Sequence, residues 1–391
     1  MLIRAAIAAF YLFYGLSGIA LPALEPASYP DATAAARPSW IGTPWIGRKV
    51  LGPVQVSEGL QYTDVQLFTQ DLALPAYWLD DGKRIALIDK AGIVTVLSVP
   101  DFTVLQRGAV GRPVLYVCQI RSGFVAGDFS AGATLIDLSK PDIIRTQPLA
   151  KGDSTAVGSM VFGSPQSNRV LTVSQNSLNE FDPGSGKFIR AIPIKFLLGD
   201  PSRLSVQEKE QYAKVIRHPA AKNSSLDIGA SAGGFASDGK TLVLKTPDGP
   251  LVRIEIGTTQ ATVKEVSAPL GGQVLPMSLD RQYLATPSAG PYDGHPTVES
   301  GSVFIYKTFD LQKPIAVIVK PAGTAIGFDG VRHRYYSAGS DRFESWTAKG
   351  DLEKAWTIPG LGRTARLILV HPSGGMALVF TELRCVWMAL P

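Results

Sequence analysis

Four histidines are the first candidates for chemistry, because imidazole transfers protons and binds metals near neutral pH. They are His218, His295, His333 and His371. No two of them stand three to five residues apart, which is the usual spacing of a zinc-binding pair. We therefore predict no metal site. We expect structural roles instead: His371 caps or covers a turn, His218 ends a helix, and His333 lies near the start of a strand.

The segment 287–296 is the strongest candidate for a binding loop, because it places Tyr292, Asp293 and His295 close together. It lengthens a predicted hairpin, and long loops on a rigid scaffold often carry binding residues. The other reading is a surface turn stiffened by proline and glycine. We predict ligand-binding candidates here and assign no catalytic residue, since Asp293 and His295 alone define no catalytic geometry.

Cysteine and glycine motifs argue against a cofactor. The two cysteines, Cys118 and Cys385, cannot form a C-x-x-C motif, a haem-attachment motif or a zinc finger. The chain also lacks a Gly-x-Ser-x-Gly elbow and a phosphate-binding P-loop. We predict no bound cofactor.

The composition is that of a folded protein with a large core, since 45% of the 391 residues are apolar and 18% are charged. The net charge of +5 comes from scattered lysines and arginines, the densest group being Arg332-His333-Arg334. A nucleic-acid-binding protein usually gathers its basic residues on one face, so we predict no nucleic-acid partner.

The first 24 residues read as a targeting segment. Arg4 is followed by an apolar run to Leu24, with small residues near its end. This pattern predicts a cleaved signal peptide, or alternatively an uncleaved membrane anchor, and either places the rest outside the cytoplasm, in the periplasm or secreted. Residues 25–47 follow as a linker rich in proline, alanine and serine, and residues 48–391 form the folded domain.

The folded domain repeats one pattern of short apolar strands separated by polar turns. In the clearest copy, Asp80-Asp81-Gly82-Lys83 separates the alternating runs 76–79 and 84–88, which indicates a β-hairpin. Similar turns recur near residues 122, 166, 238, 280, 329 and 372. Most intervals are about 41–49 residues, the length of a four-stranded propeller blade.

One interval, between the turns near 166 and 238, is longer by about 25 residues, and we expect an insertion there. Ser205-Val206-Gln207-Glu208 fits a capping box, and Pro219 ends the pattern. We predict a helix over residues 205–217, inserted between two neighbouring blades.

Two segments resemble known propeller repeats. The run Gly339-Ser340-Asp341…Trp346 is similar to part of a WD repeat, and Phe181-Asp182…Gly186-Lys187 resembles the strand end and turn of YVTN-type repeats. This resemblance implies an all-β, seven-bladed β-propeller with four-stranded antiparallel blades. The Gly-His that begins a usual WD repeat is absent from every copy, so we do not expect its histidine-containing hydrogen-bond tetrad.

Closure of such a fold makes two further predictions. The last copy has only three strands, and an open sheet edge favours aggregation. A segment between Lys49 and Thr69, near 54–56 or 65–68, should therefore add the missing outer strand. Cys118 should lie in the innermost strand of the second blade and Cys385 in the third strand of the last, too far apart to pair.

Two functions remain open. One is an extracytoplasmic scaffold that binds another protein or a cell-envelope component, with contact to the membrane only through an uncleaved N-terminal segment. The alternative is a periplasmic enzyme with its site at the mouth of the central channel, similar in architecture to amine-dehydrogenase large subunits or propeller lactonases. The fold alone supports neither, and we favour binding.

Overall fold

The computed structural model describes residues 46–66, 72–128, 132–140, 144–149, 161–174, 177–195, 205–207, 209–210, 232–245, 250–269, 277–287, 301–382 and 384–390. The predicted targeting segment and the candidate loop residues Tyr292, Asp293 and His295 lie outside these ranges. Within them, no helix has both the length and the apolar character needed to cross a membrane.

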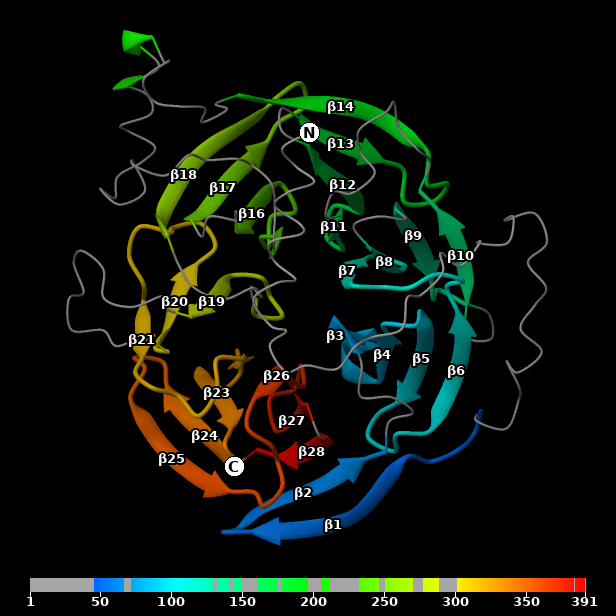
Figure 1. Cartoon of the computed structure of the whole chain (residues 1–391), viewed down its shortest axis with the longest axis vertical. Coiled ribbons are helices and arrows are strands. Elements are labelled where there is room, and N and C mark those ends of the chain that lie inside the picture. Colours follow the sequence, from blue (N-terminus) through cyan, green and yellow to red (C-terminus); the bar gives the residue numbers. More distant parts are fainter. Residues whose placement is uncertain are drawn as a thin grey trace, which may run out of the picture. The chain divides into compact units, whose positions relative to one another are not determined.

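The described residues fold into antiparallel strands that stand around a common axis, so the prediction of an all-β propeller is confirmed (Figure 1). Three sheets contain four strands each. They are β3 (Leu72–Leu79), β4 (Arg84–Asp89), β5 (Ile93–Ser98) and β6 (Val104–Ala109); β7 (Tyr116–Ile120), β8 (Gly123–Asp128), β9 (Gly132–Asp137) and β10 (Arg145–Pro148); and β22 (Ile326–Asp329), β23 (Arg334–Gly339), β24 (Arg342–Thr347) and β25 (Leu352–Thr357).

The other three sheets contain different numbers of strands. The three-stranded sheet has β19 (Tyr283–Pro287), β20 (Val303–Lys307) and β21 (Ala316–Ile318). The five-stranded sheet has β1 (Leu51–Ser57), β2 (Leu60–Val65), β26 (Ala365–Val370), β27 (Met376–Thr381) and β28 (Cys385–Ala389). The eight-stranded sheet has β11 (Val161–Ser164), β12 (Arg169–Ser174), β13 (Ser177–Phe181), β14 (Phe188–Lys195), β15 (Ala232–Phe235), β16 (Thr241–Lys245), β17 (Pro250–Ile256) and β18 (Ala261–Pro269).

The eight-stranded sheet departs from a pattern of separate four-stranded units. It consists of two consecutive antiparallel units, β11–β14 and β15–β18, whose outermost strands pair in parallel through Ile194↔Ala261 and Lys195↔Thr262. β14 is eight residues long, and its last two residues make this pairing. Two neighbouring outer edges that would otherwise be exposed therefore satisfy part of each other's hydrogen bonding.

The predicted closure is present, with a change in the residues that make it. β2 pairs antiparallel with β28 from Tyr62↔Met388 to Val65↔Cys385, so the N-terminal segment completes the C-terminal sheet. Residues Tyr62–Val65 make this pairing. Of the two predicted segments, 54–56 lies one strand further out, in β1, and 65–68 shares only Val65 with the pairing. Leu60 and Tyr62 are buried but Val54 and Val56 are exposed, so the strand with the stronger apolar anchors takes the inner position.

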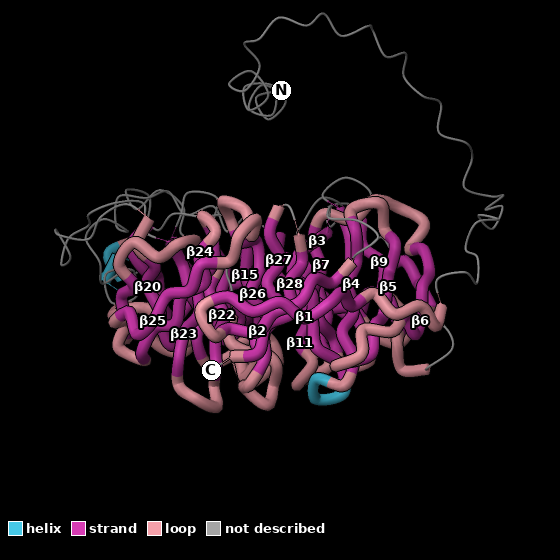
Figure 2. The backbone as a smooth tube through the Cα atoms, turned by 90° about the horizontal axis from the view of Figure 1, so that it is seen from below, coloured by secondary structure: helices cyan, strands magenta, loops and turns pink. Residues whose placement is uncertain are grey.

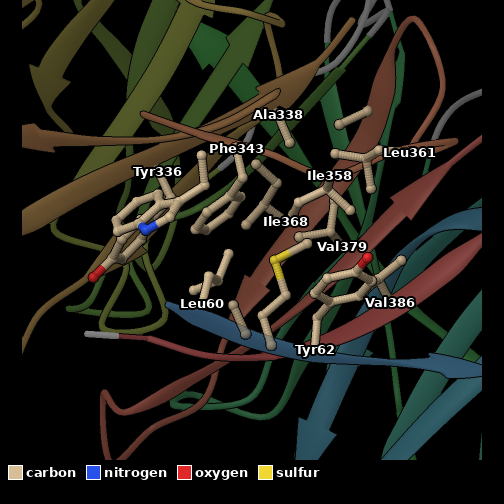
Figure 3. Close-up of a cluster of buried hydrophobic side chains, with 14 of the residues drawn as sticks. Leu60, Tyr62, Tyr336, Ala338, Phe343, Ile358, Leu361, Ile368, Val379 and Val386 are labelled. Atoms are coloured by element: carbon tan, nitrogen blue, oxygen red, sulfur yellow. The ribbon is translucent and has the colours of Figure 1, made fainter. Parts of the chain in front are cut away.

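The core lies between neighbouring sheets. In Figure 3, Leu60 and Tyr62 of β2 lie with Tyr336 and Phe343 of the preceding sheet in one buried cluster, which also contains Val386. Figure 2 shows that the described sheets stand side by side between the same two faces. Each sheet thus buries its faces only by packing against its neighbours, as stacked repeats require.

The remaining predictions about elements have mixed outcomes. Cys118 lies in β7 and Cys385 in β28, and both thiols are buried and free, as predicted. The insertion lies between β14 and β15 as predicted. Only the start of its predicted helix is described, where the backbone N–H of Lys209 donates to the carbonyl oxygen of Ser205 at 2.8 Å.

The segment that resembles a WD repeat contains a hydrogen-bond network without histidine. Trp346 Nε1 donates to Ser337 Oγ at 3.0 Å, and Ser337 Oγ donates to Glu344 Oε2 at 2.8 Å. The same carboxylate oxygen accepts the backbone N–H of Ala322 at 2.7 Å. Glu344 thus receives the hydrogen bonds that join two strands and the preceding loop.

Candidate ligand pocket

The predicted turns connect the first strand of each unit to its second strand. They lie at η2 (Asp80–Gly82), which is a 3-10 turn, and at residues 121–122, 165–168, 236–240, 278–282, 330–333 and 371–375. The first strands β3, β7, β11 and β26 lie close to the axis in Figure 1; in the unit of β19, the position before the turn is taken by Met277, which forms an antiparallel bridge with Leu284 of β19. Because each turn follows the first strand of its unit, side chains that are distant in the sequence meet at one end of the axis.

Hydrogen bonds between neighbouring turns hold them in position. Arg121 donates to the carbonyl oxygens of Pro165 and Gln166, the latter at 2.8 Å. Ser167 Oγ donates to the carbonyl oxygen of Gly239 at 2.8 Å. These bonds run from one unit to the next, so the turns are mutually braced rather than independent loops.

A cavity of about 380 Å³ lies among these turns and is hereafter the mouth pocket. Its lining comes from turns and strand ends of five of the units: Trp78, Leu79, Asp81, Arg84, Gln119, Arg121, Ser122, Leu138, Ser139, Pro165, Gln166, Leu279, Arg281 and Pro372. The volume is within the range of small-molecule sites, toward the lower end. The lining combines apolar walls with convergent polar groups, which is the usual composition of a binding site.

Arg281 is the most buried charged residue of the lining, with 9% of its surface exposed. It lies in the turn before β19 with a φ of 58°, and Thr308 Oγ1 fixes its carbonyl oxygen at 3.0 Å. Its side chain donates to the carbonyl oxygen of Phe235 at 3.3 Å, and among the described residues no carboxylate pairs with it.

Tyr77 and Cys118 interact electrostatically with this charge, and both are neutral. Burial raises the pKa of the Cys118 thiol to about 11 and also raises the pKa of Tyr77, and the positive charge of Arg281 only partly opposes both shifts. Burial likewise lowers the pKa of Arg281, although a guanidinium stays protonated at neutral pH. Tyr77 donates to the carbonyl oxygen of Val117 at 3.1 Å, and Cys118 to that of Val161 at 2.7 Å. Neither group supplies a negative charge at neutral pH.

The pocket as a whole is cationic. Arg84 begins β4, and Arg121 follows β7. With Arg281, the described lining contains three arginines and one carboxylate, that of Asp81. Arginine binds planar and tetrahedral anions through several N–H groups, and is suited to holding them rather than exchanging protons.

One wall of the pocket also closes the domain. The rings of Trp78 and His371 meet edge to face with centroids 5.2 Å apart. Nδ1 of His371 accepts the backbone N–H of Ser373 at 3.2 Å, so Nε2 carries the proton and donates to the carbonyl oxygen of Gly82, 3.3 Å away. His371 therefore caps its turn, as predicted, and also connects the last unit to the first.

The other predicted candidates have different outcomes. His333 lies exposed in the turn before β23, as the sequence indicated, with a φ of 54°. Tyr292, Asp293, His295 and His218 lie outside the described residues. The described residues contain no group of three or more His, Cys, Asp or Glu side chains that could hold a metal ion.

Sequence reasoning missed the residues that line the mouth pocket. Arg121 and Arg281 stand within predicted turns, but a charged residue in a turn is usually solvated. The sequence contained one signal for this site, because Arg121 and Arg281 occupy the same turn of different repeats. Such a recurrence places them at one end of the axis, although it does not indicate that Arg281 is buried.

The comparisons with known proteins identify the fold alone. No protein-family model matches the chain, and no curated protein matches its sequence. Among solved structures, the chain is similar to the β-propeller domain of Cps50 (Swd1) from Myceliophteria thermophila, with a TM-score of 0.56 and 12% identity. The likeness covers 88% of this chain and 100% of that one. At this identity the likeness supports the propeller and transfers no activity.

Proposed function

We propose that this chain is an exported β-propeller that works as a binding scaffold, and that it holds its ligand in the mouth pocket. The observation that carries the proposal is the convergence of side chains from five units on one cavity of about 380 Å³. The expected partner is another protein or a cell-envelope component that presents a small group to this pocket.

The chemistry of the lining favours binding over catalysis at the channel mouth. Its polar groups are mainly arginine, glutamine and serine, which orient a ligand through hydrogen bonds. Tyr77 and Cys118, which interact electrostatically with Arg281, have raised pKa values, and these oppose formation of a nucleophilic phenolate or thiolate. Tyr292, Asp293 and His295 stay candidates for additional contacts.

The same proposal includes a count of seven blades and export of the chain. The two antiparallel units of the eight-stranded sheet and the five other sheets support a count of seven blades. The apolar run that follows Arg4 supports export through a signal peptide or an anchor. Fusion of residues 1–47 to an enzyme active only after export tests this directly: activity is expected with the fusion and lost when residues 1–24 are deleted.

A ligand screen by thermal shift tests the pocket. Compounds that raise the Tm of the wild type should fail to do so for S139W, because Ser139 is exposed at the pocket and an indole there occupies its volume. The matched control is T258W, an exposed position outside the lining, which should respond like the wild type. Compounds that stabilise S139W and the wild type equally would place the binding site elsewhere and refute the proposal.

A further inference from the structure

The charge of Arg281 is the feature of the mouth pocket that most needs an explanation. A buried charge is costly unless it is paired and hydrogen-bonded. Arg281 is nine-tenths buried, yet the one hydrogen bond that its side chain makes to a described residue is to the carbonyl oxygen of Phe235, at 3.3 Å. A guanidinium has five N–H donors, so most of them lack a partner among the described residues.

The surroundings do not compensate this charge. Tyr77 and Cys118 are neutral at neutral pH, and their hydroxyl and thiol hydrogens are directed to backbone carbonyl oxygens. Asp81 is the single carboxylate of the described lining, which contains three arginines. Arg121 is bonded to two backbone carbonyls, which orient its side chain without neutralising it.

From this arrangement we propose that the mouth pocket binds a small oxyanion, a carboxylate or a phosphate group, with Arg281 as its principal contact and Arg121 as a second cation at the rim. This inference rests on the proposed function and specifies the chemical class of its ligand. The oxyanion supplies the negative charge that the lining lacks. The cavity of about 380 Å³ limits it to a small molecule or to one end of a larger one.

The planar fork of arginine gives the proposal a further consequence. Two parallel N–H groups match two oxygens of one anion, whereas lysine offers a point charge. Replacing Arg281 with lysine keeps the charge and removes the fork, and replacing it with methionine removes both. The two variants therefore separate charge attraction from bidentate recognition.

The test measures binding of inorganic phosphate and of succinate separately, by calorimetry at constant ionic strength set with chloride. Wild-type protein should bind at least one of them. R281M should lose roughly tenfold or more in affinity, the loss expected for a hydrogen bond to a charged group, and R281K should fall between. R145M, at an exposed position of β10, should bind like the wild type. Stronger binding of phosphate or of succinate identifies which oxyanion the pocket takes.

Stability without ligand provides an independent readout. If Arg281 has no counter-charge in the free protein, R281M should keep or raise the Tm. A large fall in Tm would indicate a structural partner for Arg281 and would overturn the inference, as would phosphate and succinate binding equally to wild type and R281M. Neither probe binding to the wild type would also overturn it. If neutral compounds still stabilise the wild type but not S139W, the proposed function survives and only the oxyanion inference fails.

Discussion

The indole Nε1 of Trp78 donates a hydrogen bond of 2.8 Å to the carbonyl oxygen of Val370, across 292 residues of sequence. This bond joins the inner strand of the first sheet to the inner strand of the last. It lies beside the contact between Trp78 and His371, so a single side chain serves both closure of the domain and the wall of the mouth pocket.

The W78F variant should lower the free energy of unfolding by about 1–3 kcal/mol beyond its loss of packing, because the buried carbonyl of Val370 loses its donor. W356F is the matched control: Trp356 is 2% exposed, and its indole nitrogen has no partner in the described part of the chain. Urea unfolding measures both variants. Equal losses would mean that the hydrogen bond contributes nothing to closure.

Closure by β2 predicts a contrast between two apolar residues of the N-terminal hairpin. L60A should destabilise the protein by about 2–5 kcal/mol, since it removes a large side chain from a packed core. V56A should change stability by less than about 0.5 kcal/mol, because Val56 is 64% exposed whereas Leu60 is 2% exposed. Similar small effects for both would argue that the N-terminal strand does not support the domain.

The network around Glu344 predicts coupling between two side chains. S337A should cost about 1–3 kcal/mol, because it leaves the Trp346 indole without its acceptor and removes one of the donors to Glu344. In a double-mutant cycle with W346F, the combined loss should be smaller than the sum of the single losses. Strict additivity of the two losses would contradict a shared network.

Stability at low pH should depend on Glu180, which accepts hydrogen bonds from Arg169 and Arg190, each at 2.7 Å. Burial alone would raise the pKa of Glu180, but the two arginines outweigh it and the net pKa is lowered. A lowered folded-state pKa gives stabilisation that is complete above the ordinary value of 4.5 and is lost as the pH falls through the folded-state value.

The measurement is urea unfolding between about pH 3 and pH 6. The wild type should lose stability more steeply than E180Q as the pH falls, and E180Q should be the less stable protein at neutral pH. The control is E255Q, since the pair of Glu255 with Lys264 is exposed; its pH profile should follow that of the wild type. Parallel profiles for E180Q and wild type would show that the arginine pairs do not couple to folding.

Much of the fold was determined by the sequence itself, because local signals carry it. Alternating apolar residues and turns such as Asp80-Asp81-Gly82 specify hairpins from a few neighbouring residues, and their repetition specifies a propeller. A last repeat with too few strands then requires an N-terminal strand for closure. The burial of Cys118 and Cys385 on separate sheets followed from counting strands.

Only the tertiary structure decided which residues meet. The choice of Leu60–Val65 over 54–56 as the closing strand, and the pairing of β14 with β18, depend on how neighbouring sheets pack. The same is true of the mouth pocket, where Trp78, Arg121 and Arg281 come from three different units. The local sequence pattern determines which strand or turn carries each of these residues. Whether a charged side chain is buried depends on the residues that pack around it. Those neighbours are determined by the closed arrangement of all the sheets.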